Sequence, residues 1–196
     1  MTRIIGGMAG SLQLVSPAKS TRPTSDRVRE SVFNRLSAQN HVDGAVVLDL
    51  FAGTGALGLE ALSRGAKQVV LVEQNRQAAA VCQKNTDAVT RALRNQGLDP
   101  KVSLQTVDAS GFARSLKERV SQGLTEPFDL VFIDPPYEFE NAALETLLLN
   151  LLPALETESL VIVERASRTQ AFVTPQGFEV DLVKSYGDTS VYWLAN

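Results

Sequence analysis

Short apolar runs alternate with longer amphipathic stretches along most of the chain, and this alternation predicts its fold. Runs of apolar and β-branched residues bounded by Gly, Pro, Asp or Asn indicate buried strands, whereas apolar residues spaced by three and four indicate helices. Strands are predicted over residues 45–50, 68–73, 101–107, 128–133 and 159–163. One helix is predicted to end near residue 64, two helices to run over residues 75–95 and 141–152, and a fourth to begin after Asp108. Parallel neighbours need right-handed crossovers, so the pattern predicts an α/β fold with a doubly wound, mostly parallel, Rossmann-like sheet.

Both ends of the chain depart from this alternation. At the C-terminus, two strand-like runs over residues 178–183 and 190–194 predict a hairpin that places one antiparallel strand at or near a sheet edge. At the N-terminus, a small β-hairpin within residues 3–15 and a Pro/Ser/Thr-rich connector precede a helix that Thr24 or Ser25 can cap. The predicted organisation is an N-terminal basic hairpin and helix extension, residues 1–38, followed by an α/β domain, residues 39–196.

Composition restricts the class of protein only broadly. The 196 residues are 44% hydrophobic and 21% charged, close to the average for soluble proteins, and no apolar run is long enough to span a bilayer. The N-terminus lacks the apolar core of a signal peptide. Cys82 is the single cysteine, so no internal disulfide can form, and its Ala/Val-rich surroundings predict a core position. We therefore expect a cytoplasmic protein without a metal site.

The net charge of −3 conceals an uneven distribution. Through Leu36 there are six basic and two acidic residues, a net charge of +4, and the remainder of the chain carries −7. A basic arm on an acidic body would present a positive local field to a polyanion such as nucleic acid. A solvated helix face with scattered arginines explains the same counts equally well.

One buried strand ends at an unusual turn. Residues 128–133 are mostly apolar and are followed directly by Asp134-Pro135-Pro136-Tyr137. The prolines cannot donate backbone hydrogen bonds, so the strand ends here and leaves a carboxylate, carbonyl groups and an aromatic ring at its C-terminal end. Ligands bind at that end of the strands in open α/β sheets. A Pro-Pro strand terminator beside an ordinary surface tyrosine is the structural alternative.

A second informative stretch begins in the first strand of the predicted sheet. Gly53, Gly55 and Gly58 form a G-x-G-x-x-G pattern. Glu73 ends the next strand, where an acid can accept hydrogen bonds from ribose hydroxyls. A nicotinamide-binding protein has nearly the same pattern. Asp49, however, lies within the strand, where its charge would repel a pyrophosphate but attract the ammonium group of an aminoacyl cofactor.

These groups together resemble a class I S-adenosylmethionine-dependent methyltransferase. They are the D-x-F-x-G-x-G loop, the acid after the second strand, the acid after the third, and D-P-P-Y after the fourth. In that family the loop holds the methionine part of the cofactor, the second acid binds its ribose and the third reaches its adenine. The matching cofactor-binding residues are Asp49, Phe51, Gly53, Gly55, Glu73 and Asp108. Asp108 could instead serve only as a helix cap, and Gly58 could serve only close helix–sheet packing.

The D-P-P-Y turn resembles that of methyltransferases that act on exocyclic amines of nucleobases. Such an amine is a poor nucleophile, because its lone pair is conjugated with the ring. The resemblance implies that Asp134 and the Pro135 carbonyl accept its N–H hydrogens and that Tyr137 stacks on the base. The target base must then be unpaired or flipped out. The predicted catalytic residues are Asp134, Pro135, Pro136 and Tyr137.

Most of the chain resembles one methyltransferase family more closely. The similar stretches include residues 3–7, 21–34 and 51–66. They resemble the RsmD family, which methylates the N2 amine of guanine 966 in bacterial 16S rRNA. The resemblance implies S-adenosylmethionine as cofactor, 16S rRNA of the small ribosomal subunit as partner, and a monomer. Phosphate contacts are expected from Arg22, Arg27 and Arg29, but Arg29 and Glu30 would equally well hold the helix through ion pairs.

Other functions stay open on the sequence alone. A DNA methyltransferase for adenine N6 or cytosine N4 uses the same D-P-P-Y turn, although no separate reader of base sequence is evident. A protein-glutamine methyltransferase would have Asn in place of Asp134. An NAD-dependent oxidoreductase would use the same glycines but would leave Asp49 and the turn unexplained. A non-catalytic RNA-binding module would need only the basic arm.

Overall fold

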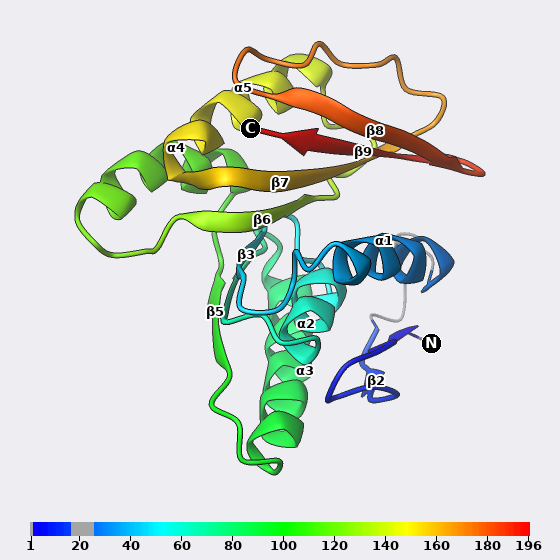
Figure 1. Ribbon diagram of the computed structural model, residues 1–196, viewed down its shortest axis with the longest axis vertical. Coiled ribbons are helices and arrows are strands. Elements are labelled where there is room, and N and C mark those ends of the chain that lie inside the picture. The colour runs from blue at the N-terminus through cyan, green and yellow to red at the C-terminus, as the bar shows by residue number, and fades with distance from the viewer. Residues whose placement is uncertain (1, 17–25) are drawn as a thin grey trace.

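The computed structural model describes residues 2–16 and 26–196 and is built around a seven-stranded sheet. Its strands are β3 (Val46–Asp49), β4 (Gln68–Val72), β5 (Lys101–Gln105), β6 (Phe128–Ile133), β7 (Leu155–Ala166), β8 (Glu179–Tyr186) and β9 (Thr189–Ala195). Their order is β5-β4-β3-β6-β7-β9-β8, and the pairing is parallel from β5 through β7. β9 is antiparallel to both of its neighbours, so one antiparallel strand lies beside the edge strand. The predicted fold class is confirmed (Figure 1).

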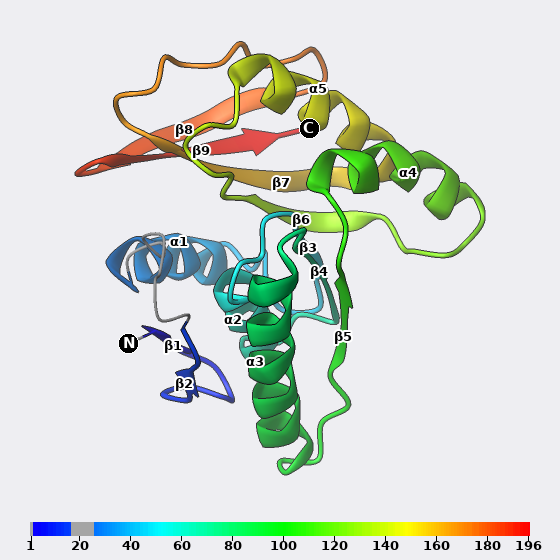
Figure 2. The same ribbon diagram turned by 180° about the vertical axis from the view of Figure 1, so that it is seen from behind.

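Helices cover both faces of this sheet. α1 (Asp26–Ala38), α2 (Ala56–Ser63) and α3 (Arg76–Arg94) lie on one face, and α4 (Ala109–Ser121), α5 (Asn141–Leu151) and the 3₁₀ helix η1 (Leu152–Ala154) lie on the other (Figures 1 and 2). On β6, Phe132 belongs to the first apolar cluster and Ile133 to the second, so this strand is buried on both faces. Cys82 is fully buried in the first cluster, as predicted. None of the helices in the described part of the chain is both long and apolar enough to cross a membrane.

Two helices begin at the predicted capping residues. Asn75 accepts hydrogen bonds from two backbone N–H groups of α3, at 2.9 and 3.0 Å. Asp108 accepts one from the N–H of Gly111 at 2.7 Å. Because the first N–H groups of a helix have no intrahelical partners, these contacts determine where α3 and α4 begin. The residues predicted to cap α1, Thr24 and Ser25, lie outside the described residues.

The last parallel strand is longer than the sequence predicted. β7 begins at Leu155 and ends at Ala166, whereas its apolar run predicted residues 159–163. The polar residues before the run include Glu158, whose φ is 63°, and the pairing with β6 shifts register between Leu155 and Leu160. The charged residues after the run stay in the strand because β9 pairs with β7 as far as Ala166.

The N-terminal hairpin packs against α2 and α3. It consists of β1 (Thr2–Arg3) and β2 (Gln13–Leu14), which are antiparallel. Ile4 and Leu14 lie in the same apolar cluster as α1 and one face of the sheet. The side chain of Asn85 in α3 accepts a hydrogen bond from the N–H of Val15 at 2.7 Å and donates one to its carbonyl at 3.0 Å. The extension and the α/β domain therefore share one apolar core.

A buried carboxylate anchors this hairpin. Glu60 of α2 is fully buried and accepts hydrogen bonds from the N–H groups of Ile5 at 2.6 Å and Gly6 at 2.9 Å. It also accepts one from Arg64 Nε at 2.7 Å, and Arg29 Nε lies 4.0 Å from it. A buried charge is tolerated only when it is paired and hydrogen-bonded, so the carboxylate and the hairpin stabilise each other.

Glu60→Gln should lower the free energy of unfolding by about 3 kcal/mol, because the amide removes the charge and turns one acceptor into a donor that faces other donors. Urea denaturation measures the change. The matched control is Glu126→Gln, which disrupts an exposed ion pair with Lys67 and should cost less than about 1 kcal/mol. Equal losses in the two variants would contradict the anchoring role of Glu60.

Candidate active site

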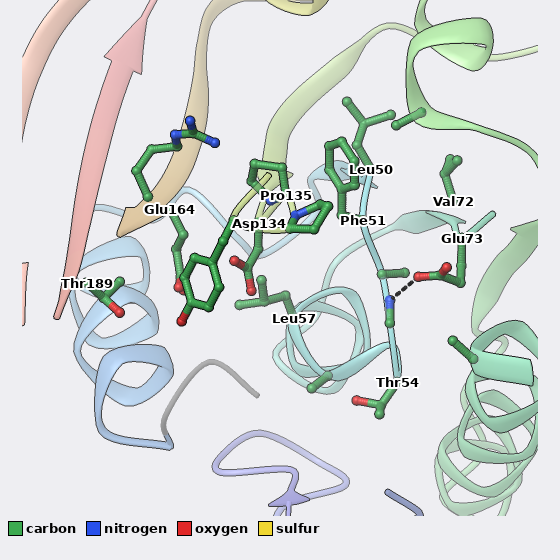
Figure 3. A pocket seen from close by; sticks show the side chains of 18 of the residues that line it. Leu50, Phe51, Thr54, Leu57, Val72, Glu73, Asp134, Pro135, Glu164 and Thr189 are labelled. Carbon is green, nitrogen blue, oxygen red and sulfur yellow. Dashed lines mark hydrogen bonds between the residues drawn. The ribbon is translucent and has the colours of Figure 1, made fainter. Parts of the chain in front are cut away.

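The C-terminal ends of the parallel strands border one cavity of about 480 Å³. Its walls come from the loop between β3 and α2, the end of β4, the turn after β6, the end of β7 and the C-terminal hairpin. The predicted site residues that line it are Phe51, Gly53, Glu73, Asp134, Pro135, Pro136 and Tyr137. Strand pairing brings them together, because Asp49 is in register with Phe132 and the N–H of Leu50 donates to the Phe132 carbonyl at 3.0 Å. Figure 3 shows the glycine loop and the turn after β6 on the walls of this cavity.

The loop between β3 and α2 depends on two glycines. Gly53 and Gly55 have φ angles of 55° and 82°, a left-handed conformation that a Cβ atom disfavours. A Cβ at Gly55 would lie 2.9 Å from Cys82 Sγ, whereas a Cβ at Gly53 would have no neighbouring atom closer than 4.0 Å. The backbone at Gly53 is therefore open to a ligand. Gly58 allows close helix–sheet packing, which was the alternative to a cofactor-binding role, because a Cβ there would collide with Leu71 of β4.

Asp49 is a buried carboxylate with an incomplete set of partners. It is 1% exposed, and its Oδ2 accepts a hydrogen bond from the N–H of Gly58 at 3.0 Å. Its Oδ1 has no hydrogen-bond partner among the described residues. Burial raises the pKa of Asp49 to about 7, and the nearby Asp134 and Glu73 carboxylates add to the increase. A cation placed beside Oδ1 would stabilise the ionised form.

Glu73 connects the glycine loop to the start of α3. Its Oε2 accepts a hydrogen bond from the N–H of Gly53 at 2.9 Å, drawn as the dashed line in Figure 3, and its Oε1 accepts one from Asn75 at 2.7 Å. Each carboxylate oxygen has a second lone pair, so Glu73 can still accept hydroxyl groups from a ligand. Its contact with a ribose stays a prediction. Its support of the loop is an additional role.

Asp108 lies at the margin of the cavity. It is exposed, and its successor Ala109 is the residue that lines the cavity wall. The hydrogen bond from Gly111 shows that Asp108 caps α4. A contact between Asp108 and adenine stays a prediction.

The D-P-P-Y turn is braced by neighbouring segments. The Pro136 carbonyl accepts a hydrogen bond from the N–H of Phe139 at 2.9 Å, and the Phe139 ring packs edge-on against Phe51 with centroids 5.2 Å apart. Arg165 of β7 donates to the Phe139 carbonyl at 2.7 Å. Tyr137, in contrast, is 54% exposed, and the Arg168 guanidinium lies over its ring at 5.8 Å from the centroid, so a flat ligand would stack opposite this cation or displace it. The turn therefore combines a rigid backbone with an accessible aromatic face.

Several cavity residues from β7 and the C-terminal hairpin were not predicted. They include Glu164, Arg165, Tyr186 and Thr189. Glu164 and Arg165 follow an apolar run at the C-terminal end of a parallel strand, which is the same signal that identified Asp134. The two hairpin residues have no such signal, because their position depends on how β9 pairs with β7.

Of the three residues predicted to contact phosphate, the structure describes two, and these lie in different environments. Arg27 of α1 is exposed, and Arg22 lies outside the described residues. Arg29 is fully buried, and its Nη2 donates to the Arg3 carbonyl at 2.5 Å and to Asp26 at 3.1 Å. Arg29 also borders the cavity, and its guanidinium pairs with Asp26 at 3.1 Å and lies 4.0 Å from Glu60 of α2, in keeping with the ion-pair alternative. A phosphate contact at Arg29 stays a prediction.

Known proteins resemble this chain over nearly its whole length. The family model described as Conserved hypothetical protein 95 matches residues 2–195. Ribosomal RNA small subunit methyltransferase D of Haemophilus influenzae is 32% identical over 190 residues, which cover 96% of this chain and 90% of the relative. The protein of the same name from Escherichia coli K12 is 38% identical over 169 residues, which cover 83% and 73%. A solved Escherichia coli structure described as a presumed methyltransferase is 29% identical, with a TM-score of 0.78 and coverage of 100% and 97%.

The sheet order and the cavity at its C-terminal rim define a class I S-adenosylmethionine-dependent methyltransferase. The chain belongs to the Conserved hypothetical protein 95 family, which is the RsmD family. The residues present fit the cofactor of this class. The open backbone at Gly53 leaves room for it on the cavity wall. Asp49 does not itself line the cavity, but its Oδ1 is a buried acceptor without a partner among the described residues and would suit the ammonium group.

Asp49 should make the affinity for S-adenosylhomocysteine depend on pH. With a pKa of about 7, Asp49 is mostly protonated at pH 6 and mostly ionised at pH 8, and the ionised form attracts the ammonium group. The affinity measured by calorimetry should therefore rise about tenfold between these pH values. The control is 5′-methylthioadenosine, which lacks the amino acid and should bind equally at both.

Asp49→Asn should weaken binding of S-adenosylhomocysteine at pH 8 and remove most of the pH dependence, because the amide does not ionise. If the wild-type protein binds S-adenosylhomocysteine equally well at pH 6 and pH 8, Asp49 does not hold the ammonium group.

Proposed function

We propose that the chain methylates the exocyclic N2 amine of a guanine in 16S rRNA, with S-adenosylmethionine as methyl donor. The proposed target is guanine 966 in the conventional rRNA numbering, in a small ribosomal subunit during assembly. One observation carries the proposal: the glycine loop and the D-P-P-Y turn line the same cavity. A cofactor on the loop and an amine on the turn would meet there. The names of the relatives support ribosomal RNA as the substrate.

The turn supplies what an unreactive aromatic amine needs. The lone pair of such an amine is delocalised into the ring, which makes the nitrogen flat and weakly nucleophilic. Asp134 and the Pro135 carbonyl would accept its two N–H hydrogens and favour a pyramidal nitrogen. The bound cofactor supplies a methyl group on a sulfonium, which is already activated for transfer. Positioning and preset polar groups then lower the barrier.

The transfer needs one new bond, one broken bond and one released proton. With the cofactor bound beside the turn, the amine nitrogen would bond to the methyl carbon as the carbon–sulfur bond of the cofactor breaks. The nitrogen then loses a proton, which Asp134 would accept and pass to water. Tyr137, with its exposed ring, would stack on the base during this step. Base pairing engages the N2 amine, so the target guanine must be unpaired or flipped out.

Asp134→Ala should reduce methyl transfer to small subunits by at least about 100-fold, because the amine loses its main acceptor. The affinity for S-adenosylhomocysteine should change by less than about threefold, because the variant keeps the glycine loop. Asp99→Ala, which alters an exposed acid in the loop before β5, is the matched control and should keep full activity. Undiminished activity in Asp134→Ala would contradict the proposed role.

The class of substrate is tested with labelled S-adenosylmethionine and three acceptors, namely unmodified small subunits, naked 16S rRNA and DNA. Label in either RNA acceptor supports the proposal. Label in DNA alone would favour an adenine-N6 or cytosine-N4 DNA methyltransferase. Binding of NAD in place of S-adenosylhomocysteine would instead favour an oxidoreductase.

Arg27 should contribute to RNA affinity and not to cofactor affinity. It is exposed on α1, so Arg27→Ala should weaken binding to 16S rRNA and reduce its salt dependence by about one phosphate contact. Arg114→Ala is the matched control, because this exposed arginine belongs to α4, which covers the opposite face of the sheet from α1 (Figure 1). Equal losses of RNA affinity in both variants would indicate general charge attraction and contradict a specific contact at Arg27.

A further inference from the structure

A second carboxylate lies beside Asp134 at the rim of the sheet. β6 and β7 are parallel, and Ile133 is in register with Val163. Asp134 directly follows Ile133 at the end of β6, and Glu164 directly follows Val163 in β7. Neighbouring strands are about 4.8 Å apart, and residues in register point to the same face of a sheet. Both acids line the cavity, and Figure 3 shows their side chains directed toward the same part of it.

Glu164 is held in a largely buried position. It is 7% exposed, and its neighbour Arg165 is fixed by the hydrogen bond to the Phe139 carbonyl. Burial lowers the pKa of Arg29, and Glu164 is among the carboxylates that oppose this decrease. A carboxylate has about four lone-pair sites, so contacts within the protein leave capacity to accept a ligand N–H.

The amines of the nucleobases differ in the ring atom beside them. The N2 amine of guanine lies next to N1–H, which is a donor. The N6 amine of adenine lies next to N1, and the N4 amine of cytosine lies next to N3, and both of these atoms are acceptors. A carboxylate beside the amine-binding acceptors would therefore accept a hydrogen bond from guanine but would repel the lone pair of adenine or cytosine.

We propose that Glu164 accepts the N1–H of the target guanine and thereby selects guanine over adenine and cytosine. This inference rests on the proposed function, in which Asp134 and the Pro135 carbonyl hold the amine. The three donors along the edge of guanine then meet three acceptors from two adjacent strand ends. A buried acceptor that faces a lone pair loses its hydrogen bond, and sites built around such bonds reject substrates that lack the donor.

2-Aminopurine tests this contact, because it keeps the amine at position 2 but has a lone pair at N1 in place of N1–H. Small subunits are reconstituted with 16S rRNA that carries guanine or 2-aminopurine at the target position. The wild-type protein should have a kcat/KM at least about 100-fold lower for 2-aminopurine. Glu164→Gln, whose amide can donate to N1, should reduce this preference to less than about tenfold.

Comparing the base preference of the wild-type protein with that of Glu164→Gln isolates the Glu164 contact. The two bases also differ at position 6 and in amine reactivity, but these differences affect both proteins equally. Glu140→Gln is the matched control, because Glu140 is an exposed acid before α5 that does not line the cavity, and it should keep the wild-type preference. Unchanged affinity for S-adenosylhomocysteine shows that the Glu164→Gln site is folded.

The outcomes separate this inference from the proposed function. If the wild-type protein methylates guanine and Glu164→Gln keeps the full preference, the N1–H contact is wrong and the proposed function stands. If the wild-type protein methylates neither base, the proposed function fails. If Glu164→Gln does not bind S-adenosylhomocysteine, Glu164→Ala, which removes the acceptor without adding a donor, is compared with the wild-type protein in its place, and an unchanged preference would overturn the inference.

Discussion

The register between parallel strands is the constraint on which the site depends. Because β3, β4, β6 and β7 run in the same direction, the residues that end them meet at one rim. Acids at this rim come close enough to influence one another, and Asp49 is the clearest case. Its pKa is raised by burial and by the carboxylates of Asp134 and Glu73. The free energy stored in this unfavourable burial is what a cationic ligand can relieve.

The N-terminal extension is joined to the same rim through buried polar side chains. Asn85 binds the backbone of Val15 at the end of the hairpin and also donates to the Thr54 carbonyl in the glycine loop at 2.8 Å. Glu60 fixes the other end of the hairpin from α2. The hairpin of the basic N-terminal arm and the loop predicted to hold the cofactor therefore share a buried support in Asn85.

Local patterns were sufficient for most of the elements. The apolar run over Phe128–Ile133, the caps Asn75 and Asp108 and the mostly parallel sheet depend on nearby residues and on general rules of chain connection. The same rules placed Asp134, Glu73 and the glycine loop at one cavity.

The features that the sequence did not predict depend on contacts between distant residues. Arg29 lies on the buried face of α1, between Leu36 and Phe33 in helical projection, so the spacing alone could have predicted its burial. Its partners, Glu60 and the Arg3 carbonyl, belong to other elements. The full length of β7 and the place of Tyr186 and Thr189 in the cavity wall depend on how β9 pairs with its neighbours. Periodicity within one element contains no information about such partners.

The most direct measurement identifies the methylated nucleoside. Unmodified small subunits are incubated with the protein and labelled S-adenosylmethionine, and the 16S rRNA is then digested to nucleosides and separated by chromatography with mass detection. If Asp134 holds the N2 amine of the target guanine and Glu164 holds its N1–H, the label should appear in N2-methylguanosine at a single position. Label in N6-methyladenosine or N4-methylcytidine, or no label in rRNA, would contradict this account.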